Sequence, residues 1–184
     1  APNLSLNYNS NSQNGWIGVG WGLDMGAIQR ATKRGVNYSA NDYIVMINGS
    51  SSELVSRGDW GTNYYGAKIE GTFSKYYYNT GTGGWEVTTK DGIKYYYGTT
   101  ASSRQNNPYN YNNSNEVFKW FLDRVQDTNG NYMTVSYINE QGVTYLDIID
   151  YTGNTNNLSP SNYVKLIREG SLLKTIEVFA SGQF

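Results

Sequence analysis

Alternating apolar and polar residues, interrupted by glycine-containing turns, are the feature that most constrains how this chain can fold. Residues 85–89 alternate in this way, and residues 93–97 do so again after the pair Asp91-Gly92. A period of two is typical of a strand with one buried face, and Asp-Gly is a favoured pair in the type I′ turn of a β-hairpin. We therefore predict one hairpin over residues 85–97, with positive φ at both Asp91 and Gly92.

The same signals recur in the second half of the chain. Asn129-Gly130 separates a strand that ends near Val125 from one over residues 132–138, and a third strand follows over residues 143–149. Three strands in this order predict an antiparallel meander. The other predicted strands are residues 4–8, 43–47, 53–55, 163–168 and 172–179.

Two patterns compete in residues 116–125. Phe118, Phe121, Leu122 and Val125 have the spacing of a helical stripe. Alternation through the same residues, followed by an Asn-Gly turn at hairpin distance, favours a strand, which we predict. The predicted loops are residues 101–115 and 153–162.

The composition limits both the fold class and the chemistry. The chain has 18 Tyr and 21 Gly, and only 16% of its 184 residues are charged, which is typical of strands and turns rather than of helices. We predict an all-β protein whose antiparallel hairpins and meanders form a curved, extended sheet of the shell-wall or sandwich-like type, with little helix. Residues 1–184 are expected to be a single module and a fragment of a larger polypeptide.

The absence of Cys and His excludes several kinds of site. Cys/His zinc sites, Ser-His-Asp triads, Cys nucleophiles and haem ligation by His cannot form. The formal net charge is -1 and the basic residues are scattered, so a nucleic-acid partner is not expected. The apolar stretches are too short to span a bilayer. We expect no cofactor, no metal and no membrane span.

A glycine-rich segment near the start invites comparison with phosphate-binding loops. Gly15, Gly18 and Gly20 lie beside Trp16 and Trp21, but neither the GxGxxG spacing nor a Gly-Lys-Ser/Thr run is present. We predict instead a bent or bulged strand, in which the glycines allow close backbone approach. The two tryptophans are expected to pack as large anchors.

Asp127, Asn129 and Asn131 have the spacing of alternate oxygen ligands in a calcium loop, with Gly130 between them. The twelfth position of an EF-hand loop, which requires a bidentate acid, is Ile138. A hairpin turn is therefore the favoured interpretation.

A glycosidase requires two facing carboxylates. Asp147 and Asp150 are three residues apart, so strict alternation along a strand places them on opposite faces. The same alternation separates Leu146 from Ile149. The sequence pairs no two acids, and we do not expect a polysaccharide-degrading enzyme.

Clustered tyrosines need an explanation of their own. Triplets occur at residues 76–78 and 95–97, and Tyr109 and Tyr111 lie in the predicted loop. On a strand, the first and third rings of a triplet share a face, so cross-strand packing accounts for them. A carbohydrate-binding platform is the alternative, because flat rings stack on sugars and Asn side chains bind hydroxyl groups.

Four stretches of the chain carry a resemblance to a known family. They are residues 4–10 with Asn14-Gly15, residues 18–23, Ile28 and Arg30; Asp91-Gly92 with residues 95–98; residues 120–125 with Asp127 and residues 129–131; and residues 149–154. Together they resemble the SpvB-type N-terminal domain. That domain also begins the TcB components of insecticidal Tc toxin complexes and is often followed by Rhs/YD repeats.

The resemblance implies a non-catalytic wall segment of a hollow shell. In Tc toxins, the TcB and Rhs-bearing parts form a cocoon of strands around a toxic C-terminal effector. The ADP-ribosyltransferase of some family members is a separate C-terminal domain. The matching residues are implied to be structural: Gly15, Gly18, Gly20, Trp21, Trp120, Asp123, Asn129, Gly130 and Asn131.

Our leading hypothesis is therefore a structural or interaction module of a secreted or cell-surface bacterial protein, not an enzyme. Its expected partner is the remainder of a larger Rhs/Tc-like protein or a toxin-complex subunit. The alternative hypothesis is a cell-surface carbohydrate-binding module in which Tyr109 and Tyr111 contact the glycan.

Overall fold

The computed structural model describes residues 2, 4–11, 14–23, 25–47, 49–69, 71 and 73–181. Within these ranges there is no helix, and the paired strands are antiparallel. The prediction of an all-β protein with a curved, extended antiparallel sheet is confirmed. No helix in the described part of the chain is long and apolar enough to cross a membrane. The strands are β1 (Leu6–Tyr8), β2 (Asn14–Gly15), β3 (Gly18–Val19), β4 (Trp21–Leu23), β5 (Ala27–Arg30), β6 (Tyr43–Ile47), β7 (Ser50–Ser56), β8 (Tyr64–Ala67), β9 (Lys75–Asn79), β10 (Gly84–Thr88), β11 (Lys94–Tyr97), β12 (Arg104–Asn106), β13 (Val117–Gln126), β14 (Asn131–Glu140), β15 (Val143–Asn154), β16 (Asn162–Glu169) and β17 (Leu172–Phe179).

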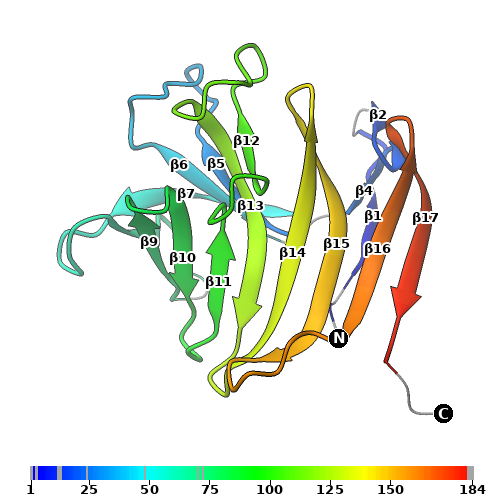
Figure 1. Cartoon of the computed structure of the whole chain (residues 1–184). Helices are drawn as coiled ribbons and strands as arrows, with labels where there is room; N and C mark the ends of the chain where they lie inside the picture. Colours follow the sequence, from blue (N-terminus) through cyan, green and yellow to red (C-terminus); the bar gives the residue numbers. More distant parts are fainter. Residues whose placement is uncertain are drawn as a thin grey trace.

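Eight of these strands close into a barrel. The order around it is β5-β6-β7-β8-β9-β10-β11-β13, and β13 pairs with both β11 and β5. Lys119 pairs with Gln29 of β5 near one end of β13, and Val125 pairs with Tyr95 of β11 near the other. In Figure 1, β13 runs between the barrel on the left and the open sheet on the right. An eight-stranded barrel is just wide enough for side chains to fill its interior.

Large aromatic side chains fill this barrel. Trp85 is fully buried, and its ring centroid lies 4.8 Å from that of Tyr43 and 5.1 Å from that of Tyr78. Tyr76 and Tyr78 of one triplet contribute to this core, so the rule that the first and third rings share a face is confirmed. The buried residues of the barrel core are Ile28, Tyr43, Val45, Leu54, Tyr65, Tyr76, Trp85, Val87, Tyr97, Val117, Trp120 and Leu122.

Arg30 fastens one end of the barrel. Its side chain is buried, and its Nε donates to the backbone carbonyl of Val117 at 2.9 Å. One terminal nitrogen of its guanidinium donates to the carbonyl of Ala40 at 2.7 Å and to that of Asn37 at 3.3 Å. The guanidinium carbon also lies 5.5 Å from the ring centroid of Tyr43. Arg30 therefore joins β5, β13 and the loop before β6.

Because the phenol of Tyr43 is buried, the free energy of unfolding varies with pH in the alkaline range. Burial raises the pKa of Tyr43 from 10.0 to about 12, although the nearby Arg30 guanidinium acts in the opposite direction. Between these two values the unfolded chain loses a proton that the folded chain keeps, so the free energy of unfolding falls as pH rises. We expect lower stability at about pH 11 than at about pH 9 in urea unfolding. The Tyr43→Phe variant should show a shallower decrease, and an equal decrease would contradict this assignment.

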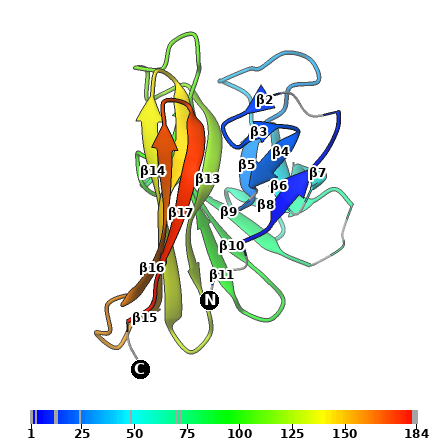
Figure 2. The ribbon, with the colours of Figure 1, turned by 90° about the vertical axis from the view of Figure 1, so that its right-hand side faces the viewer.

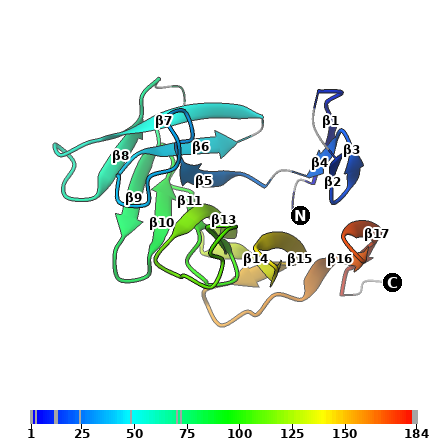
Figure 3. The ribbon, with the colours of Figure 1, turned by 90° about the horizontal axis from the view of Figure 1, so that it is seen from above.

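Beyond the barrel, β13 continues into an open sheet in the order β14-β15-β16-β17. Two small hairpins, β1 with β4 and β2 with β3, cover part of its inner face. Figures 2 and 3 show these N-terminal strands facing β15–β17, on the same side of the open sheet as the barrel. The second core lies between them and comprises Val135, Tyr137, Leu146, Ile149, Val164 and Leu166, packed against Leu4, Trp16, Leu23, Met25, Phe121, Met133, Tyr151 and Leu173.

The predicted hairpins are confirmed, but one turn type was wrong. Trp85 pairs with Tyr97 across the Asp91-Gly92 hairpin, yet only Gly92 has positive φ, at 80°. Gly92 N donates to the carbonyl of Thr89 at 2.9 Å, which makes a longer turn that ends in a left-handed glycine. The tight turn with two positive φ values lies instead at Gln141 and Gly142, with 49° and 83°.

Two other predictions need correction. In β14–β15 the pairing shifts between Ser136 and Tyr137, which face Ile148 and Leu146, so Asp147 is an extra residue. This bulge brings Leu146 and Ile149 into the same core, where strict alternation had separated them. Within predicted loop 101–115, β12 pairs with β13.

Candidate functional site

The long strand β13 changes its neighbours halfway along its length. On one edge, Phe121 pairs with Ala27 of β5, whereas Arg124 pairs with Thr134 of β14. On the other edge, β13 pairs first with β12 and then with β11. We call the point of change, residues 122 and 123, the strand fork. There the sheet divides into the closed barrel and the open sheet, so both depend on its geometry.

Asp123 holds the strand fork through one oxygen atom. Its side chain is buried, and Oδ2 accepts hydrogen bonds from Thr99 N at 2.6 Å, Thr99 Oγ1 at 2.9 Å, Thr100 N at 2.9 Å and Ser103 Oγ at 2.7 Å. Ser103 is itself fully buried. These bonds satisfy backbone and hydroxyl donors of the turn between β11 and β12. The carboxylate therefore has a structural role at the fork.

Trp120 and Gly98 pack together beside this turn. Trp120 Nε1 donates to the carbonyl of Gly83 at 2.8 Å, which ties β13 to the turn before β10. Gly98 has φ of 63°, and a Cβ atom there would lie 2.2 Å from Cδ1 of Trp120. Only glycine fits both this backbone conformation and this contact. From β14, Tyr137 Oη donates to the Leu122 carbonyl at 2.6 Å, so the open sheet is also bound to the fork.

Three of the sequence motifs meet at one end of the sheet: Asp91-Gly92, residues 127–131 and the end of residues 149–154. We call this group of turns the turn cluster. A Cβ atom on Gly92 would lie 2.9 Å from Cγ2 of Thr128, and one on Gly130 would lie 2.2 Å from Oγ1 of Thr155. Asn154 Nδ2 donates to Asn131 Oδ1 at 2.8 Å and to the carbonyl of Asn129 at 3.2 Å. The turn cluster explains why these glycines and asparagines occur together: they allow neighbouring turns to touch.

The suggested calcium ligands form part of the same cluster. Asp127 Oδ1 accepts from the backbone N of Asn129 at 2.8 Å and of Asn131 at 2.9 Å, and Oδ2 accepts from Asn131 Nδ2 at 2.8 Å. The amide of Asn131 and these backbone bonds hold the pKa of Asp127 below its ordinary value. The geometry is that of a hairpin turn. Within the described ranges, no three His, Cys, Asp or Glu residues gather as metal ligands do.

The glycine-rich segment forms the N-terminal hairpins. Gly20 has φ of 79° and lies against Tyr8, whose Cε2 would be 2.7 Å from an added Cβ atom. Trp16 packs as predicted, with its ring centroid 6.1 Å from that of Tyr145 and its carbonyl accepting from Leu173 N at 2.7 Å. Trp21 is not a buried anchor, because it is 46% exposed and its ring packs on that of Tyr8 at the surface. Gly15 and Gly18 pair with each other across β2 and β3.

The two loop tyrosines lie apart from all of these motifs. Tyr109 is 98% exposed and Tyr111 is 47% exposed. Tyr111 lines a hollow of about 230 Å³ between β12, the loop that follows it and the β14–β15 turn. Four hollows on the described surface each contain at most one carboxylate, and none includes Asp147 or Asp150.

Sequence patterns missed the partners of Asp123. Thr99 and Ser103 lie in or beside a predicted loop, where hydroxyl residues are common and carry no specific signal. Arg30 was part of the family resemblance, but one of its carbonyl acceptors, Val117, lies 87 positions away in the chain.

A comparison with protein families decides the relationship of this chain. The model described as SpvB, Salmonella virulence plasmid 65kDa B protein, matches residues 1–182. The chain belongs to the SpvB family. Two curated relatives are mono(ADP-ribosyl)transferase SpvB from Salmonella choleraesuis (strain SC-B67) and from Salmonella enteritidis. Each is 24% identical to this SpvB-family chain, over 97% of the chain and 34% of the relative. The chain therefore spans about a third of their length.

Solved structures share the fold of this SpvB-family chain. The N-terminal domain of effector protein SpvB from Salmonella typhimurium strain LT2 superposes with a TM-score of 0.73 and 20% identity, over 90% of this chain and 67% of that one. TcdB2-TccC3 superposes with a TM-score of 0.68 and 21% identity, over 90% of this chain and 10% of that one. The fold predicted from the resemblance is thus found both in SpvB and within the much longer TcdB2-TccC3 chain.

Proposed function

We propose that this SpvB-family chain is a non-catalytic structural module of a secreted bacterial Rhs- or Tc-toxin-like protein, and that it forms part of a β-strand shell that encloses or presents an effector. Its partner is the rest of that protein or a toxin-complex subunit. Two observations support the absence of catalysis: the described hollows bring no two carboxylates together, and Oδ2 of the buried Asp123 at the strand fork is engaged by the turn that it holds.

The observation that carries the proposal is the apolar face of β17. Val178 pairs with Val164 and Ile176 pairs with Leu166, so each pair shares a face of the sheet. Val164 and Leu166 are 4% and 3% exposed, whereas Val178 and Ile176 are 67% and 42% exposed. The inner apolar face therefore continues beyond the area that the N-terminal hairpins cover. An apolar strand at the edge of a sheet invites a further strand or layer.

The greater length of the similar structures favours further polypeptide as the partner that covers this face of β17. The part that superposes on this chain covers 67% of the solved SpvB N-terminal domain and 10% of TcdB2-TccC3. In a shell of this kind, additional strands extend the same sheet and bury the side chains that β17 exposes. Burial of each valine-sized side chain contributes about 1.5–3 kcal/mol, which gives the module a strong preference for its covered state.

The test compares this chain with the longer polypeptide that contains it. We expect Val178→Asp to lower the free energy of unfolding of the longer protein by about 2 kcal/mol, because it buries a charge, and to leave that of the 184-residue chain almost unchanged. Urea unfolding measures both values. Val19→Asp is the matched control, since Val19 is 70% exposed on β3. An equal effect of Val178→Asp in the two proteins would refute burial of β17.

A further inference from the structure

The hollow beside Tyr111 is built from three parts of the chain. Its walls include Gln105, Tyr111, Asn112, Asn139 and Gln141, and its volume is about 230 Å³. We call it the amide hollow. A volume below the ~300–1,000 Å³ of sites for drug-sized molecules suits one small ring.

Hydrogen bonds fix the shape of the amide hollow before any ligand arrives. Asn106 Nδ2 donates to the carbonyl of Tyr111 at 2.9 Å, and Asn107 Nδ2 donates to Glu116 Oε2 at 2.6 Å. The loop also lies on the β14–β15 turn, where a Cβ atom on Gly142 would be 3.3 Å from Cβ of Tyr111. A preorganised wall reduces the entropy that is lost when a ligand binds.

The lining is neutral and rich in unused hydrogen-bonding groups. Within the described structure, the side-chain amides of Gln105, Asn112 and Gln141 have no hydrogen-bond partner, and each offers two donors and an acceptor. Arg104 contributes its backbone carbonyl, which accepts from Asn139 Nδ2 at 3.3 Å. Its guanidinium points elsewhere and donates to the carbonyls of Gly98 and Thr82. None of the lining residues is acidic.

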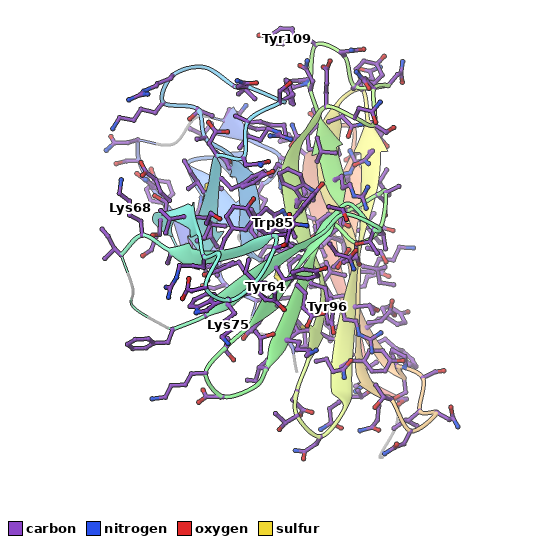
Figure 4. The ribbon with its side chains drawn as sticks, turned by 90° about the vertical axis from the view of Figure 1, so that its left-hand side faces the viewer. Tyr64, Lys68, Lys75, Trp85, Tyr96 and Tyr109 are labelled. Carbon is purple, nitrogen blue, oxygen red and sulfur yellow. The ribbon has the colours of Figure 1, made fainter. Side chains whose placement is uncertain are left out.

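Aromatic rings complete the surroundings. Tyr111 forms one wall and is 47% exposed, and Tyr109, two residues earlier, is 98% exposed. Figure 4 shows Tyr109 at the outer end of its loop, away from the strands. A fully exposed ring buries no surface in the fold, whereas Tyr beside Asn is a combination that supplies contact area and adaptable hydrogen bonds to a ligand.

We propose that the amide hollow binds a neutral sugar unit of an oligosaccharide. The free amides of Gln105, Asn112 and Gln141 bind the hydroxyl groups, the face of the sugar ring packs on Tyr111, and Tyr109 contacts the next unit. Charged ligands are disfavoured because no side-chain charge faces the hollow. This binding site goes beyond the structural function and does not depend on it.

Saturation-transfer NMR tests the proposal with the 184-residue chain and neutral tetrasaccharides of glucose, galactose, mannose and N-acetylglucosamine. We expect at least one to bind. Tyr111→Ala should weaken its binding about tenfold, the loss expected for one aromatic contact. Tyr111→Phe should retain most of the affinity, and Asn112→Ala should weaken binding several-fold while leaving the fold intact, as judged from the amide spectrum of the protein.

Asn156→Ala is the matched amide control, because Asn156 is exposed in the loop after β15, at the opposite end from the amide hollow. It should leave affinity unchanged. The proposal is overturned if none of the four tetrasaccharides binds, as would be the case for a hollow that accepts a protein segment. It is also overturned if binding survives both Tyr111→Ala and Asn112→Ala, or if an anionic heparin tetrasaccharide binds more tightly than all neutral ones.

Discussion

Replacing Trp85 by Ala should lower the free energy of unfolding by about 3–5 kcal/mol, the cost of removing a large buried aromatic side chain. The ring is fully buried at the centre of the barrel, with the rings of Tyr43, Tyr65, Tyr78 and Trp120 within 6.1 Å of it, centroid to centroid. Few neighbours can move into the space, since each belongs to a different strand of a closed sheet. Urea unfolding measures the loss, and near-ultraviolet circular dichroism should lose much of its aromatic signal.

Trp21→Ala is the matched control for this experiment. Trp21 is 46% exposed and contacts Tyr8 at a centroid distance of 5.2 Å, so its removal should cost less than about 1.5 kcal/mol. Trp85→Phe keeps most of the buried ring and should fall between the two variants. A loss for Trp85→Ala as small as that for Trp21→Ala would mean that the barrel interior is not a packed core.

The second large effect is expected at the strand fork. Asp123→Ala removes the acceptor of four hydrogen bonds and leaves the backbone N–H groups of Thr99 and Thr100 without their partner. Hydrogen bonds to a charged group contribute about 1.5–3 kcal/mol each, and those from Thr99 and Thr100 are partly buried, so the free energy of unfolding should fall by about 3–5 kcal/mol. Hydrogen exchange should show the same two amides losing protection together.

Asp123→Asn separates the role of the charge from that of the oxygen. The amide keeps one oxygen acceptor, but hydrogen bonds to a neutral group are about half as strong. Asp123→Asn should therefore lower the free energy of unfolding by about half as much as Asp123→Ala does. Asp59→Asn, at a surface pair with Arg57, should leave the unfolding midpoint where it is. Equal midpoints for wild type and Asp123→Ala would show that the turn between β11 and β12 is held by other contacts.

Local patterns predict the strands well because each hairpin is specified by residues that are close in sequence. Alternation around Asp91-Gly92 and Asn129-Gly130 located β10, β11, β13 and β14 correctly. Closure of the barrel could not be predicted in this way, because it depends on β13 pairing with two distant strands, β5 and β11. The bulge at Asp147 was missed for a related reason: the sequence pattern does not mark the extra residue.

The same distinction between local and distant contacts applies to the site residues. The glycines at positions 92 and 130 were identified from turn chemistry, and their contacts with Thr128 and Thr155 explain them. Asp123 was identified only through the family resemblance, since a single acid in an alternating strand has no distinctive spacing. Its partners Thr99 and Ser103 come from a turn 24 and 20 positions away, where neither period nor motif indicates a contact.

The double pairing of β13 sets an order of events during synthesis. Arg30 and Val117, which meet where β13 closes on β5, are 87 positions apart in the chain. Strands β5 to β11 are therefore synthesised before β13. One edge of β5 stays unpaired until β13 has been made. Such distant pairing slows folding and exposes the nascent chain to misassociation. Chaperone binding before residue 126, and release after β13 has paired, would follow from this arrangement.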